Sequence, residues 1–345
     1  MLVPPDRGSP APVPSATPAG AGDPPPGRPG SGTFTIEGRS APALFVVGWL
    51  GTLLGLGAVV VAVLAGGSAA STVVLIVGLV VLSIGLIAGA GSQGIERRAR
   101  ARAAYLGPSP FLVFATSIPV SLLAAIALGV PLGLLGIALD GPVGRLASVS
   151  AQAIVYVALI RLLVVDTGAL TWAQMGLRRF DGAAVTNLAL GAALALPVIA
   201  ATVPVVAILG QLFPVTPVSP LPPAGEPVGF ALNLVAGAII APIGEEILFR
   251  GFATTAWARD LGARRALVQG ALFFAVVHVI TITGGTAGEA IGLAVLGFAA
   301  RVPVSLALGW LFLRRGSIWA SIGLHAAFNG ILIVLAEAAL QAVPA

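Results

Sequence analysis

The chain has 345 residues, of which 57% are hydrophobic and only 9% are charged. Soluble globular domains carry roughly 25% charged residues, so water cannot be the main solvent of this chain. The absence of cysteine excludes disulfides, thiolate metal sites and a cysteine nucleophile. The net charge of +5 comes from arginines in short clusters between apolar runs, which indicates membrane topology rather than a nucleic-acid surface.

Residues 1–40 are rich in Pro, Gly, Ser and Ala and contain almost no large apolar side chains. Such a composition cannot bury a core, so we expect a disordered cytoplasmic tail. The apolar run that begins at Leu44 lies too far from Met1 to be a cleaved secretory signal. We therefore interpret it as a retained membrane span.

A hydrocarbon core of about 30 Å requires about 20 apolar residues per helix. Segmentation at that length predicts an all-α protein, a polytopic transmembrane helical bundle of about nine spans. Four spans belong to an N-terminal region, residues 41–182, and five to a second region, residues 183–340. The expected spans are 44–65, 73–91, 111–139, 146–165, 185–209, 229–249, 266–283, 290–313 and 318–339. The third contains Pro119 and Pro131, which favour a kink or a partly re-entrant path.

Short cytoplasmic loops collect Lys and Arg, and arginines follow every second expected span. They are Arg97, Arg98, Arg100 and Arg102 after the second, Arg178 and Arg179 after the fourth, Arg259, Arg264 and Arg265 after the sixth, and Arg314 and Arg315 after the eighth. The loops between them hold far fewer cations. The alternation predicts a multi-pass protein of the plasma membrane with a cytoplasmic N-terminus.

Charged side chains are costly inside a bilayer, so each is a candidate functional group. Almost all of them lie in the last four spans: Glu245, Glu246, Arg250, His278, Arg301 and His325, with Asn329 as a polar companion. Glu246 and Arg250 are four residues apart and can pair on one helix face, whereas Glu245 points about 100° away. His325 and Asn329 share a face for the same reason. Counting about 1.5 Å per residue places the group in the inner half of the membrane, open to the cytoplasm.

A carboxylate beside imidazoles can activate water, either as a general base or through a bound metal. An asparagine can donate a hydrogen bond to a developing oxyanion. Peptide hydrolysis needs these groups. Two other protease signatures are missing, because the sequence has no His-Glu-x-x-His and the segment Trp319–Gly323 does not read Gly-x-Ser-x-Gly. Arg301, beside Pro303, is interpreted as a charge partner or a snorkelling anchor.

Three motifs within residues 229–330 resemble those of the CPBP intramembrane proteases, a family that includes the CAAX prenyl proteases of the Rce1 type and the bacterial Abi or bacteriocin-immunity proteins. The motifs are Glu-Glu-x-x-x-Arg at Glu245–Arg250, Phe-x-x-x-His at Phe274–His278 and His-x-x-x-Asn at His325–Asn329. Their order and spacing also fit. The resemblance does not extend to the tail or to the first four spans.

The resemblance implies a role for each matching residue. Glu245 resembles the catalytic base that activates water, and His278 resembles its assistant. His325 and Asn329 resemble an oxyanion-stabilising pair. Glu246, together with its partner Arg250, resembles the residues that hold the site in shape.

The family is named a metalloprotease, which raises the question of a metal. Glu245, His278 and His325 form a His₂Glu set, which suits a catalytic Zn²⁺ with one open position. A metal-free glutamate mechanism stays open beside it.

The sequence thus predicts an intramembrane endopeptidase that cuts a membrane-associated protein or peptide near the cytoplasmic face. One alternative is a non-catalytic bacteriocin-immunity or scaffold membrane protein with the same fold. Another is an ion-coupled transporter, since intramembrane Glu, His and Arg also mark ion pathways. A transporter predicts more polar residues in the first half than Gln152, Tyr156 and Arg161.

Overall fold

The computed structural model describes residues 36, 38–101, 103–213, 215 and 222–342. The chain divides into two units, Met1–Gly38 and Arg39–Ala345, and the description below concerns the second. The expected tail, residues 1–40, lies almost entirely outside the described residues.

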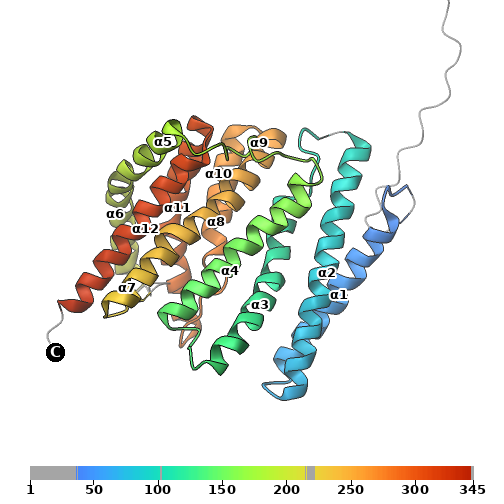
Figure 1. Cartoon of the computed structure of the whole chain (residues 1–345), viewed down its shortest axis with the longest axis horizontal. Helices are drawn as coiled ribbons and strands as arrows, with labels where there is room; N and C mark the ends of the chain where they lie inside the picture. The colour runs from blue at the N-terminus through green and yellow to red at the C-terminus, as the bar shows by residue number, and fades with distance from the viewer. Residues whose placement is uncertain (1–35, 37, 102, 214, 216–221, 343–345) are drawn as a thin grey trace, which may run out of the picture. The chain divides into compact units, whose positions relative to one another are not determined.

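All regular structure in the described residues is helical, which confirms the all-α prediction. Figure 1 shows the helices of the second unit running alongside one another. They are α1 Pro42–Leu64, α2 Ala69–Arg100, α3 Pro110–Leu134, α4 Pro142–Ile160, η1 Arg161–Val165, α5 Gly182–Ala193, α6 Ala195–Leu212, α7 Pro227–Leu234, η2 Val235–Ile240, α8 Ala241–Glu246, η3 Ile247–Thr254, α9 Thr255–Leu261, α10 Ala263–Val277, α11 Ala287–Arg315 and α12 Ile318–Gln341. The elements η1, η2 and η3 are π-helical.

Local sequence signals set many of the helix boundaries. Four helices that follow a non-helical segment begin with a proline in their first turn, where its missing N–H costs nothing: α1, α3, α4 and α7. Side-chain oxygens of Ser68, Asp181, Glu226 and Thr286 cap the first turns of α2, α5, α7 and α11. Gly316 ends α11 in the left-handed conformation, with φ of 58°. Despite Pro119 and Pro131, α3 is one continuous helix.

Eight helical runs in the described part of the chain are each long and apolar enough to cross a membrane, and one of the nine expected spans is not among them. The segment expected as the seventh span forms α10, whose 15 residues rise about 22 Å, less than a hydrocarbon core of about 30 Å. The helix ends because Thr281, Thr283 and two glycines follow it, and these residues favour turns over helix. An irregular segment, residues 278–286, then leads to α11.

The arginine-rich ends of the helices lie on one side. Three contacts join them: Arg97 at the end of α2 with Asp260 at the end of α9 (3.4 Å), Arg98 with the Thr167 carbonyl after η1 (3.5 Å), and the Ile318 N–H at the start of α12 with the Gly176 carbonyl (3.1 Å). Because α11 returns to this same side, α10 and residues 278–286 must together make the crossing for which α10 alone is too short. Irregular backbone at membrane depth is tolerated where protein covers it or where it lines a cavity.

The run from α7 to α9 occupies the centre of the second region. Its α8 and η3 segments pack against α4 and α12, and η3 also contacts α10 and α11. The phenylalanines Phe249 and Phe252 of η3 are almost fully buried, 2% and 0% exposed. The central run is therefore enclosed by tightly packed helices and apolar side chains, which can hold polar side chains in place.

Candidate active site

The structure brings together five of the six predicted site residues. Glu245 and Glu246 are the last two residues of α8, Arg250 lies in η3, His278 directly follows α10, and His325 lies in α12. Asn329 follows one turn after His325 but contacts a different part of the central run. Four helical elements thus converge on two adjacent carboxylates.

Glu246 and Arg250 form the buried centre of this cluster. Their ion pair measures 2.9 Å between Arg250 Nη1 and Glu246 Oε1, and the two side chains are 2% and 0% exposed. Arg250 Nη2 also donates to Ser305 Oγ of α11 at 2.7 Å. The same Glu246 oxygen lies 2.8 Å from His325 Nδ1. The pair predicted from its four-residue spacing is confirmed, and its burial rules out a merely solvated ion pair.

Glu245 faces the other way, toward the two histidines. Its Oε2 atom lies 3.4 Å from His278 Nε2 and 3.9 Å from His325 Nε2. The side chains of Glu245 and His278 retain 18% and 25% exposure, whereas those of Glu246 and Arg250 have almost none. The Glu245–His278 side is therefore the less buried part of the cluster, although Glu245 Oε2 itself is buried.

The hydrogen bonds of the two imidazoles determine which nitrogen carries the proton. His278 Nδ1 lies 2.7 Å from the Phe274 carbonyl oxygen, and His325 Nδ1 lies 2.8 Å from a Glu246 oxygen that also accepts from Arg250. Both partners only accept, so each Nδ1 is the donor, and in a neutral imidazole Nε2 is then an acceptor. Glu245 Oε2 accepts no hydrogen bond from any described residue. Three acceptors thus converge, an arrangement that favours a group bringing protons or positive charge, such as a water molecule.

Asn329 contacts the backbone of the central run. Its Nδ2 donates to the Gly237 carbonyl oxygen of η2 at 2.9 Å. Gly237 lies five residues before Pro242, which is the spacing of a π-helical hydrogen bond, and proline has no N–H to donate. Asn329 therefore supplies the donor that Pro242 lacks, and its second Nδ2 hydrogen stays available.

Sequence reasoning missed two contributors to the site. Ser305 accepts from Arg250, and the Phe274 ring lies 4.2 Å below the Arg250 guanidinium in a cation–π contact. Phe274 was visible only as a motif position. Ser305 could have been noticed in the sequence because it is a small polar residue in a mostly apolar helix, one turn after Arg301.

Arg301 stays apart from the carboxylates. Its Nη1 donates to the Gly297 carbonyl of its own helix at 2.9 Å, and no described carboxylate forms an ion pair with it. The interpretation of Arg301 as a charge partner is thus not supported by a direct contact.

The described His, Asp and Glu side chains around Glu245 do not have the arrangement of a metal site. In the described part of the chain, no group of three or more His, Asp or Glu side chains has an arrangement that would hold a metal ion. Glu245, His278 and His325 are close, but both Nε2 atoms make their near approach to one carboxylate oxygen. These three side chains therefore do not form a ligand cage for zinc.

The helical run that carries Glu245 extends farther than expected. It continues from Pro227 to Leu261, whereas the sequence predicted an end at Phe249. Glu245 therefore lies about 24 Å of helical rise from the arginine-rich end of this run, instead of about one turn. His325 lies only about 10 Å from the start of α12. The expected opening toward the cytoplasm stays a prediction.

Fold and site together define the class: a multi-pass α-helical membrane protein with a glutamate–histidine cluster buried among its helices. Comparison with known families agrees, because residues 227–331 match the model described as Rce1-like, type II CAAX prenyl endopeptidase Rce1-like. The chain therefore contains an Rce1-like domain over this stretch, fewer than a third of its residues, and all six predicted site residues lie in it. No curated protein and no solved structure matched the chain.

Proposed function

We propose that this protein is an intramembrane endopeptidase that hydrolyses a peptide bond in a membrane-associated protein or peptide. The observation that carries the proposal is the approach of Glu245 Oε2 to His278 Nε2, 3.4 Å, on the less buried side of a cluster whose other carboxylate is already neutralised by Arg250. A carboxylate without a structural ion-pair partner is free to accept a proton. The Rce1-like domain match supports the same class of reaction.

The proposed reaction begins with a water molecule held by Glu245 and His278. Glu245 takes one proton of the water as its oxygen attacks the carbonyl carbon of the substrate. The carbonyl oxygen becomes an oxyanion and the carbon becomes tetrahedral. The C–N bond then breaks, and the proton held by Glu245 passes to the leaving amine, so that an acid and an amine are released and Glu245 is ionised again.

Two donors are assigned to the oxyanion. Asn329 has a second Nδ2 hydrogen beyond the one it gives to Gly237. His325 can donate from Nε2 only as an imidazolium, whose charge would face Glu246. Donors fixed in a water-poor site stabilise developing charge more than they would in water.

The test is hydrolysis of a membrane-proteome or peptide library by the purified protein in detergent. We expect cleavage by the unaltered chain and a loss of at least about a hundredfold in Glu245→Gln and His278→Ala, the order contributed by general base catalysis. Asp140→Asn, which changes an exposed carboxylate outside the cluster, is the matched control and should keep full activity.

Dialysis against a chelator forms a second arm. We expect activity to persist, because the described side chains form no ligand cage. Loss on dialysis and recovery with Zn²⁺ would instead assign Glu245, His278 and His325 to a metal. If unaltered and variant proteins are equally inert in all lipids and metals tried, the immunity, scaffold or carrier alternatives replace the protease.

A further inference from the structure

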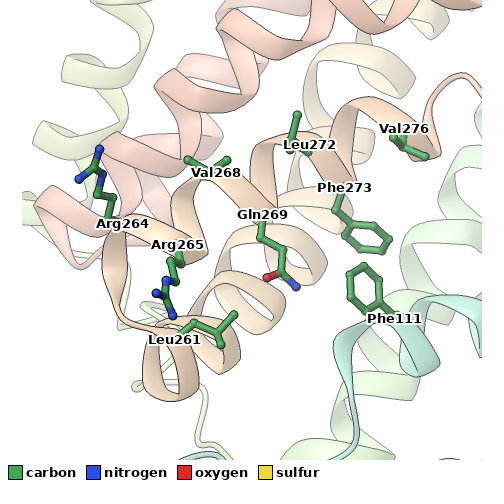
Figure 2. A pocket seen from close by; sticks show the side chains of 9 residues that line it. All are labelled: Phe111, Leu261, Arg264, Arg265, Val268, Gln269, Leu272, Phe273 and Val276. Atoms are coloured by element: carbon green, nitrogen blue, oxygen red, sulfur yellow. The ribbon is translucent and has the colours of Figure 1, made fainter.

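A wide groove lies outside the catalytic cluster, on the outer face of α10. Its volume is about 710 Å³, and it is bounded on one side by Phe111 at the start of α3. Figure 2 shows that its lining is dominated by side chains of α10. Two rows at four-residue spacing form it: Arg264, Val268, Leu272 and Val276, and beside them Arg265, Gln269 and Phe273. Each row begins with an arginine; the first continues into apolar side chains, and the second passes through the polar Gln269 to Phe273.

The two arginines have no internal role in the described structure. Neither forms an ion pair with a described carboxylate, although both sit in the first turn of α10, where the helix dipole disfavours a cation. No side chain caps this turn, so its first N–H groups add to the positive field. A second groove, between α4 and α8, also contains an arginine, but Arg161 there pairs with Asp166 at 3.7 Å. The groove on α10 thus combines two uncompensated charges with an apolar channel.

The apolar part of the groove has a firm floor and no protein cover. The Phe111 and Phe273 rings stack edge to face at 4.9 Å, and Trp257 packs behind them at 5.2 and 5.6 Å. Val268, Leu272 and Val276 remain 48%, 44% and 43% exposed. From Arg264 to Val276 the helix rises about 18 Å, close to the depth of one leaflet of a hydrocarbon core about 30 Å thick.

We propose that this groove binds one anionic glycerophospholipid. The phosphate of its headgroup contacts Arg264 and Arg265 at the arginine-rich membrane face, and one acyl chain lies along Val268, Leu272 and Val276 over the Phe273 ring. Charge complementarity selects the anionic lipid over a zwitterionic one, because arginines near a membrane surface attract anionic headgroups. Since α10 ends at His278, the lipid would sit against the helix that positions this histidine.

Tryptophan fluorescence can report the bound lipid. Trp257 lies behind the groove floor, so the other four tryptophans are replaced by Phe and the protein is reconstituted in phosphatidylcholine vesicles with rising fractions of brominated lipid. We expect brominated phosphatidylglycerol to quench Trp257 at a mole fraction roughly tenfold lower than brominated phosphatidylcholine. Arg264→Gln with Arg265→Gln should bring this ratio to near one. Arg178→Gln with Arg179→Gln, an exposed pair outside the groove, should leave it unchanged.

Equal quenching by the two lipids in the starting protein overturns the proposal, as does equal loss in both arginine double variants. Should the single-tryptophan protein fail to fold, native mass spectrometry of the full chain from mixed micelles gives the same comparison by counting retained phosphatidylglycerol. Loss of the retained lipid only in the groove variant supports the site; retention in that variant refutes it. Neither readout depends on proteolysis, so failure here leaves the proposed enzyme untouched.

Discussion

Adjacent glutamates perform different tasks in this site because consecutive helical positions differ by about 100°. Glu246 points into the interior, where Arg250 and His325 use the same oxygen. Glu245 points to the less buried side, where His278 is the near neighbour. The pair thus divides into a buried structural carboxylate, Glu246, and a less buried one, Glu245, which we propose as the base.

The structural carboxylate leads to a prediction about stability. Glu246→Gln should destabilise the protein by about 3–5 kcal/mol, because it leaves the buried Arg250 charge uncompensated. Arg250→Met should lower the free energy of unfolding by a similar amount, because it leaves the buried Glu246 carboxylate without its cation. The double variant should recover part of the loss, since it buries no unpaired charge.

Thermal unfolding of the four proteins in one detergent measures this cycle. Additive losses in the double variant would show that the two side chains are not coupled. Glu245→Gln is the control, because Glu245 Oε2 accepts no hydrogen bond from the described residues and this change leaves the Glu246–Arg250 pair intact, so it should move the unfolding temperature far less.

At the scale of elements, two π-helical segments flank the short α8 that carries both glutamates. η2 precedes it and η3 follows it. A π segment changes which carbonyls are free, and such segments are frequent at functional sites. Here Pro242 has no N–H to donate to the Gly237 carbonyl, and Asn329 donates to it across the helix interface instead. The proline thereby links the shape of the central run to α12.

This link predicts a specific compensation. Asn329→Leu should destabilise the protein by about 1–3 kcal/mol, since it leaves a buried carbonyl without a donor. Pro242→Ala restores an N–H at the π-helical spacing, so the same Asn329 change should cost clearly less in the Pro242→Ala background. Unfolding temperatures of the two single variants and the double variant decide the matter. Equal costs in both backgrounds would contradict the proposed exchange of donors.

Close helix packing supports α12 on its other side. A Cβ atom at Gly191 of α5 would collide with the Ala320 backbone, and one at Gly323 would collide with the Leu188 backbone. Small residues at such crossings let helices approach closely in lipid, where packing replaces the hydrophobic driving force. His325, two residues after Gly323, therefore has a position determined by this contact as well as by Glu246.

At the scale of the whole molecule, the arginine-rich helix ends are joined by contacts on one side, but the side of the membrane on which they lie follows only from the charge rule. The chain has no cysteine, so single introduced cysteines can report this without background. Ala138 and Ala173 are both exposed, the first between α3 and α4 and the second between η1 and α5.

We expect a membrane-impermeant maleimide to label Ala138→Cys in intact cells and to label Ala173→Cys only after permeabilisation. This outcome would place the arginine-rich ends, and therefore the N-terminal end of α1, in the cytoplasm. The reverse labelling pattern would show that the protein has the opposite orientation in the membrane. Labelling of both variants after permeabilisation controls for reactivity.

Much of the site was predictable because its signals are local. Charged residues in apolar runs are rare, and four-residue spacing places Glu246 with Arg250 on one helix face without further information. The motif order also predicted the Rce1-like domain that the family comparison found. The seventh expected span was harder, because α10 is apolar enough but too short, and only the contacts at the helix ends show how the chain completes that crossing.

Composition and the spacing within single helices were enough to predict the lipid solvent of this protein, its helical class and the candidate residues of its site. Only the tertiary structure decided how those residues meet. It turned His278 toward Glu245, used Ser305 and Phe274 to hold Arg250, and assigned Asn329 to the Gly237 carbonyl. These contacts join helices far apart in the chain, and no local pattern encodes the packing that brings them together.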